Sequence, residues 1–149
     1  MPGPVVREIE AKSILNPSKI HDYCVNPYTG CEVGFTIATD EETTSRMFEL
    51  RASPVGERIE VLREFKAAGV STFAFAGPLL PGNPERPAAL LAGAVDRVLI
   101  DRMNYVPAVR DFYARHCLLD ALTDSFFRTQ SARLEKALRA RGVRVETVF

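Results

Sequence analysis

Three cysteines are among the residues of this chain whose side chains could bind a metal or react as nucleophiles. Cys24 and Cys31 are seven residues apart, and Cys117 is remote from both. A zinc site usually draws its ligands from close pairs of Cys or His, and an iron–sulfur cluster needs several thiolates. The spacing therefore favours three reduced thiols.

The residues leading up to Cys31 carry a resemblance to a known family. Segments 12–20 (KSILNPSKI) and 26–31 (NPYTGC) resemble the opening of the spore-photoproduct-lyase-like branch of the radical S-adenosylmethionine enzymes. In that family the motif continues as Cys-x3-Cys-x2-Cys. Here Phe35 and Ala38 stand where the second and third cysteines would fall. The resemblance therefore makes Cys31 a relic of the metal-binding cluster motif.

The rest of the chain is similar to the second half of the barrel in the same family. The similar segments, which follow one another in family order, are 33–39 (VGFTIAT), 48–49 (FE), 53–58 (SPVGER), 76–82 (AGPLLPG) and 98–105 (VLIDRMNY). The junction after Cys31 then corresponds to a deletion of the middle of the barrel. The resemblance implies one truncated domain over residues 1–149, with an N-terminal arm and cluster-loop remnant at 1–32 and the second half of the barrel at 33–149.

A complete member of this family binds a four-iron four-sulfur (4Fe-4S) cluster and S-adenosyl-L-methionine, which it cleaves to a deoxyadenosyl radical. Three thiolates hold the cluster, and one cannot. The resemblance therefore implies a radical S-adenosylmethionine protein without independent catalytic activity, unless a partner or second chain supplies the absent half. The alternative is a non-catalytic half-barrel that serves as a binding or interaction module, or a deletion product without a selected role. An unrelated small α/β binding protein is a third interpretation, which leaves the ordered segments unexplained.

Four residues are candidates for binding the cofactor that the resemblance implies. Thr36 and Thr39 come at the C-terminal end of a predicted strand, where barrel enzymes place ligand contacts. Glu49 and Arg58 lie in the neighbouring family-like segment. These side chains could face a pocket of the size of S-adenosylmethionine. Alternatively, Glu49 and Arg58 form an ordinary surface ion pair of little energetic value.

Hydrophobic patterning predicts alternating strands and helices. The predicted strands are 23–25, 33–38, 70–76, 97–100 and 143–149; the predicted helices are a short one ending at Phe48 and capped by Thr39 and Asp40, and longer ones at 53–69, 84–93, 106–116 and 123–142. This alternation predicts an α/β fold, a partial (β/α) barrel with a mostly parallel sheet of about four to five strands and helices packed on its outer face. The apolar strand 70–76 is expected to be buried on both faces.

The short connection between the first two predicted strands has a structural consequence. Parallel neighbours need a crossover of about a dozen residues or more, and only residues 26–32 join these strands. We therefore expect residues 23–25 to form an antiparallel hairpin or to stay loose. The strand from Val33 to Ala38 then becomes an uncovered edge, which predicts either a homodimer through it or poor solubility.

Composition limits the remaining possibilities. The chain has 149 residues with 46% hydrophobic side chains, which suits one domain with a core. Lysine plus arginine equal aspartate plus glutamate at 19 each, so charge gives no support for a nucleic-acid partner, although the named relative acts on a DNA photoproduct. No apolar run has the length of a membrane span and no signal peptide is evident, so we expect a cytoplasmic protein.

Overall fold

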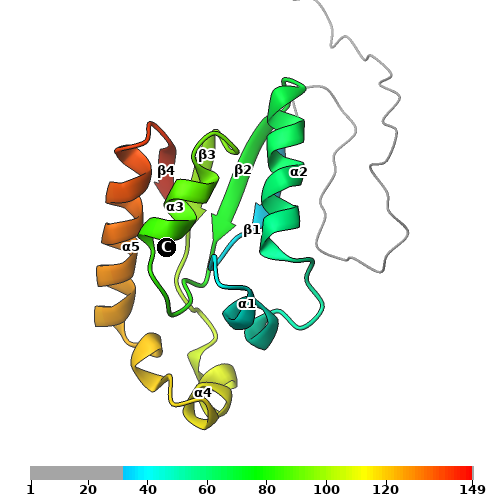
Figure 1. The fold of residues 1–149 in the computed structure, drawn as a ribbon. Coiled ribbons are helices and arrows are strands. Elements are labelled where there is room, and N and C mark those ends of the chain that lie inside the picture. The colour runs from blue at the N-terminus through cyan, green and yellow to red at the C-terminus, as the bar shows by residue number, and fades with distance from the viewer. Residues whose placement is uncertain (1–31, 149) are drawn as a thin grey trace, which may run out of the picture.

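Residues 32–148 form one sheet with helices packed against it in the computed structural model, which describes only these residues (Figure 1). The strands are β1 (Glu32–Thr36), β2 (Ser71–Ala76), β3 (Arg97–Ile100) and β4 (Arg144–Thr147). They pair in parallel, in the order β1-β2-β3-β4. The predicted α/β class and parallel sheet are confirmed. Cys31 and the strand predicted at 23–25 lie outside the described residues.

The helices connect the strands in chain order. Between β1 and β2 come α1 (Glu42–Phe48) and α2 (Val55–Ala67), and between β2 and β3 comes α3 (Glu85–Leu91); between β3 and β4 come α4 (Val106–Arg115), the 3-10 helix η1 (Leu119–Leu122) and α5 (Asp124–Arg139). Parallel crossovers are almost always right-handed, so strands added in sequence order send their helices to the same face. Figure 1 shows α2, α3 and α5 on one face of the sheet. None of the helices within residues 32–148 is long and apolar enough to cross a membrane.

The core lies between this face and the helices. Alternate residues of each strand point into it, because successive side chains of a strand face opposite sides. The core members include Val33, Phe35, Ala74, Ala76, Val98, Ile100 and Val145 from the sheet and Ile59, Leu62, Leu91, Leu134 and Leu138 from the helices. Burying one such aliphatic side chain stabilises the fold by about 2 kcal/mol.

The opposite face of the sheet is covered by none of α2, α3 and α5. We call it the open face and define it by Gly34, Phe73, Phe75, Arg97 and Leu99, all of which are half-buried. The expectation that β2 is buried on both faces is therefore wrong for the described residues, because its burial alternates along the strand. Both faces of β2 carry apolar side chains, but α2, α3 and α5 pack against only one of them (Figure 1).

Local signals explain several helix boundaries. The hydroxyl of Thr123 accepts a hydrogen bond from the Phe126 N–H at 3.2 Å and caps α5 as predicted. Gly69 and Gly142 have φ of +80° and +74° and follow the ends of α2 and α5, where a left-handed residue is needed.

Two predicted helix starts differ from the structure. The N-cap of α1 is Glu41, without a side-chain cap, and Thr39 instead accepts a hydrogen bond from the Glu41 N–H at 3.1 Å. Helix α2 begins at Val55, with Pro54 as its N-cap, whereas the predicted helix begins at residue 53. The N–H of Val55 donates to Glu42 Oε2 at 3.1 Å, so a carboxylate of α1 caps α2. A cap supplied by another helix has no local sequence signal.

Candidate functional site

A buried arginine joins three elements at the carboxyl end of β1. The side chain of Arg58, in the first turn of α2, is only 5% exposed. Its Nη1 donates to the backbone carbonyl of Thr36, the last residue of β1. Its Nη2 donates to Ser45 Oγ at 3.0 Å and to Glu49 Oε2 at 2.7 Å. The Arg58–Glu49 pair is therefore largely removed from solvent, unlike an ordinary surface ion pair.

Ser45 completes this network and was not among the residues predicted from sequence. It is 3% exposed and donates from Oγ to Glu49 Oε2 at 2.9 Å. The only sequence signal is its spacing, four residues before Glu49 in a predicted helix, which places both side chains on one helix face. Arg58 Nε is buried and has no hydrogen-bond partner among residues 32–148.

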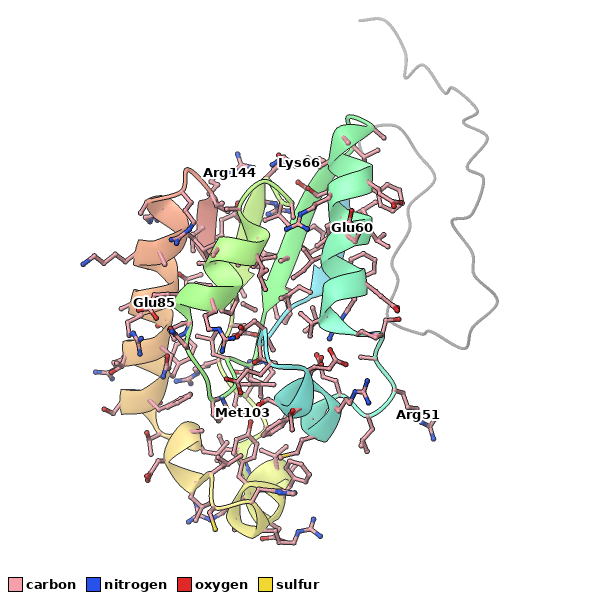
Figure 2. The ribbon with its side chains drawn as sticks, viewed as in Figure 1. Arg51, Glu60, Lys66, Glu85, Met103 and Arg144 are labelled. Atoms are coloured by element: carbon pink, nitrogen blue, oxygen red, sulfur yellow. The ribbon has the colours of Figure 1, made fainter. Side chains whose placement is uncertain are left out.

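A hollow of about 490 Å³ opens beside the network. Its lining residues are Phe35, Thr36, Phe48, Glu49, Leu50, Arg51, Ala52 and Arg58. The volume falls within the range of small-molecule pockets, about 300–1,000 Å³. At its rim Leu50 is 86% exposed and Arg51 is also exposed. Figure 2 shows Arg51 at the connection between α1 and α2, pointing away from the body of the molecule.

The structure brings three of the four predicted cofactor-binding residues together. Thr36, Glu49 and Arg58 all line this hollow. Thr39 is instead buried, at 3% exposure, and lines a separate cavity of only about 20 Å³ together with Asp40 and residues of α3 and α5. Such a volume is close to that of a single water molecule, so Thr39 does not share a ligand-sized space with the other three.

The carboxylate of Glu42 holds the rim of the hollow in place. It accepts from Arg46 Nε at 3.1 Å within α1 and from the Val55 N–H of α2. The Arg46 hydrogen bond, and after it the Val55 hydrogen bond, hold the pKa of Glu42 below its usual range. The charged form of Glu42 therefore links α1 and α2 at neutral pH.

The described residues do not fit an iron–sulfur cluster. Phe35 and Ala38, which occupy the positions of two cluster cysteines in the resembled family, are 3% and 7% exposed. Phe35 is part of β1 and packs in the core, and neither side chain has a ligand atom. Within residues 32–148 no group of three or more His, Cys, Asp or Glu side chains could hold a metal ion. Cys117 follows α4, is exposed, and has no disulfide partner in the part of the chain that the structure describes.

Comparisons of the chain with models of protein families, with curated proteins and with solved structures give no match.

Proposed function

We propose that this chain is a non-catalytic half of a radical S-adenosylmethionine type (β/α) barrel, which binds a small charged metabolite at the carboxyl end of β1. The observation that carries the proposal is the placement of Phe35 and Ala38. Phe35 lies in β1, an edge strand of the described sheet, and packs in the core, and Ala38 is buried two residues after the end of β1. The carboxyl end of the parallel sheet, where barrel enzymes bind their ligands, is therefore retained in this proposal, whereas two of the three cluster thiolates of the resembled family are absent.

The hollow offers complementary groups for an amino-acid moiety. Oε2 of Glu49 accepts both hydrogen bonds, from Ser45 and Arg58, so Oε1 can still accept one from an ammonium group. The terminal nitrogens of Arg58 already donate to protein acceptors, which leaves Arg51 as the cation at the rim for a ligand carboxylate. To reach a bound ligand, the exposed Arg51 side chain must turn toward the hollow from the outward position in Figure 2. An arginine fork matches a carboxylate in a bidentate geometry.

The apolar lining of the hollow suits a flat ring. Phe35, Phe48 and Leu50 contribute to it beside the charged groups. An apolar wall with a few placed polar groups is the usual composition of a small-molecule site. The ligand class that fits both features is an adenosyl compound with an amino-acid end, such as S-adenosylmethionine or S-adenosylhomocysteine.

Calorimetric titration of the full chain with each of these two compounds, without added iron, tests the proposal. We expect the wild-type chain to bind. Arg51→Ala should weaken binding by about tenfold or more, the value of one hydrogen-bonded charge. Arg128→Ala, which removes an exposed arginine from α5, is the matched control and should leave affinity unchanged. No binding to the wild-type chain, or equal effects of the two substitutions, would contradict the proposal.

A second candidate function is a radical enzyme completed by a partner. It is favoured by the position of β1, whose outer side is paired with no other strand of the described residues. A partner that supplied the missing barrel strands and cluster ligands would add to this edge. Co-expression with such a partner should then give iron-dependent cleavage of S-adenosylmethionine, which the isolated chain would lack.

The same edge carries our proposal of a homodimer through Val33 to Ala38. An uncovered edge strand is a template for pairing with another chain. We further propose a cytoplasmic location, because Cys117, an exposed thiol that forms no disulfide within residues 32–148, suits a reducing compartment. The balanced charge gives no support for a nucleic-acid partner.

A further inference from the structure

We propose that two copies of this chain join their four-stranded sheets into one eight-stranded parallel barrel, with β4 of each copy paired to β1 of the other. The inference rests on the proposal that the sheet is half of a (β/α) barrel. It does not depend on which ligand occupies the hollow beside Arg58.

The topology of the sheet supplies half of such a barrel. An eight-stranded (β/α) barrel has parallel strands in sequence order and all its helices outside. The described residues have four strands in that order, with α2, α3 and α5 on one face. Because β1 and β4 run in the same direction, a two-fold axis would create two identical parallel β4–β1 junctions. The closed ring would leave neither strand as an edge.

The open face has the composition of a barrel interior. Phe73, Phe75 and Leu99 are large apolar side chains that the helices leave half-buried. The ring of Phe73 fills the space over Gly34, where any Cβ would overlap it. Large residues beside small ones are typical of side chains that fill a closed barrel. A second copy facing this surface would remove these apolar groups from water.

No strand within residues 32–148 pairs with the outer edge of β4. The N–H groups of Arg144 and Val148 donate to carbonyls of the β3 side, at 3.4 Å to Asp96 and 3.1 Å to Ile100. Because backbone groups alternate along a strand, the N–H groups of Val145 and Thr147 point away from β3.

The outer edge of β1 offers backbone donors and acceptors that complement those of β4. The N–H of Ile37 donates to the Phe75 carbonyl of β2 at 2.9 Å. By the same alternation, the backbone groups of Gly34 and Thr36 point away from β2. The two edges therefore present complementary rows of donors and acceptors in the same strand direction.

Charges on the open face fit this pairing. Side chains of β4 on that face are Arg144 and Glu146, and β1 contributes Glu32. A shift of two residues in the pairing of two strands leaves every side chain on the same face of the sheet. A register therefore exists in which Arg144 lies opposite Glu32 of the second copy. Opposite charges across a strand pair are stabilising. Within one chain, Arg97 already bridges Glu32 and Glu146 on this face.

Light scattering after size exclusion, over a range of concentrations, tests the inference on the full chain. We expect twice the mass of one chain. Thr147→Pro removes an N–H that points away from β3, and edge positions tolerate proline. Since both junctions lose a hydrogen bond, the dimer dissociation constant should rise by about ten- to a hundredfold. Thr147→Val keeps the N–H and is the matched control that should remain dimeric.

A second variant covers the case that Thr147→Pro fails to fold. Leu99→Gln places an amide on the open face; it should weaken the dimer while circular dichroism shows a native fold. A wild-type chain that stays monomeric at all concentrations would overturn the inference, whatever covers the outer edges of β1 and β4. A dimer that resists both Thr147→Pro and Leu99→Gln would also overturn it, because the contact would lie elsewhere. Ligand binding by a monomeric wild-type chain would refute the barrel closure alone and leave the proposed ligand site standing.

Discussion

Arg58 links the end of β1 to α1 through one buried guanidinium. Sequence resemblance placed Glu49 and Arg58 in one candidate site, and the structure pairs them at 2.7 Å. Sequence could not show that Arg58 is buried, because its burial depends on how α1 folds against α2. The role of Ser45 was missed for the same reason, since a serine within a helix is usually solvated.

Replacing Arg58 tests how much this network contributes to stability. Arg58→Met leaves Glu49 without its cationic partner and Ser45 Oγ without its donor, and removing one partner of a buried pair costs about 3–5 kcal/mol. Arg46→Met is the matched control, because the Arg46–Glu42 pair is exposed, at 76% and 40%. The control should cost less than about 1 kcal/mol. Urea denaturation monitored by circular dichroism measures both, and equal losses would contradict the structural role of Arg58.

Asp96 gives a prediction for acid stability. Its Oδ2 accepts from the Thr72 N–H at 2.9 Å and its Oδ1 pairs with Lys66 Nζ at 3.0 Å. The Thr72 hydrogen bond, opposed by some desolvation and aided by Lys66, lowers the pKa of Asp96 below its ordinary 3.8. The charged form then stabilises the fold fully above pH 3.8, and this contribution is lost as the pH falls through the lowered pKa.

Asp96→Asn should therefore reduce the unfolding free energy at neutral pH and make its fall below about pH 4 less steep. Unfolding free energies measured at several pH values give the comparison. If the unfolding free energies of the wild-type chain and the variant fell equally steeply with decreasing pH, Asp96 would contribute nothing to the pH dependence.

Local patterns predicted most helices and strands, because caps and left-handed glycines are written in the sequence. Thr123 and Gly142 mark the two ends of α5, and Gly69 follows α2. Burial of β2 was predicted less well. Phe73 and Phe75 look like core residues in the sequence STFAFA, yet what covers them is not encoded in neighbouring residues.

The packing of β1 against β2 gives a prediction for strand substitutions. In Gly34→Ala the new Cβ would overlap the ring of Phe73, and overpacking of this kind costs about 1–3 kcal/mol. Gly56→Ala in α2 is the matched control, because nothing lies within 4 Å of its new Cβ. The control should stabilise by about 0.5–1 kcal/mol, as helical glycines are entropically costly. Thermal or chemical unfolding that ranks the two variants in the opposite order would contradict the described packing.

The molecule as a whole is a one-sided sheet whose first and last strands are both edges of the described fold. Strand-helix alternation alone predicts a parallel sheet but does not fix the strand order. The order follows from right-handed crossovers and from which edge each strand joins, and these depend on the complete fold. The barrel geometry inferred from resemblance remains a proposal, tested by the dimer experiment.

Anaerobic reconstitution of the purified, untagged full chain with iron and sulfide is the most direct test of the central claim. With Phe35 and Ala38 in place of two cysteines, we predict no cluster absorption, no paramagnetic cluster signal after reduction, and no reductive cleavage of S-adenosylmethionine. A brown protein that retains four irons per chain after desalting and cleaves S-adenosylmethionine would contradict the account.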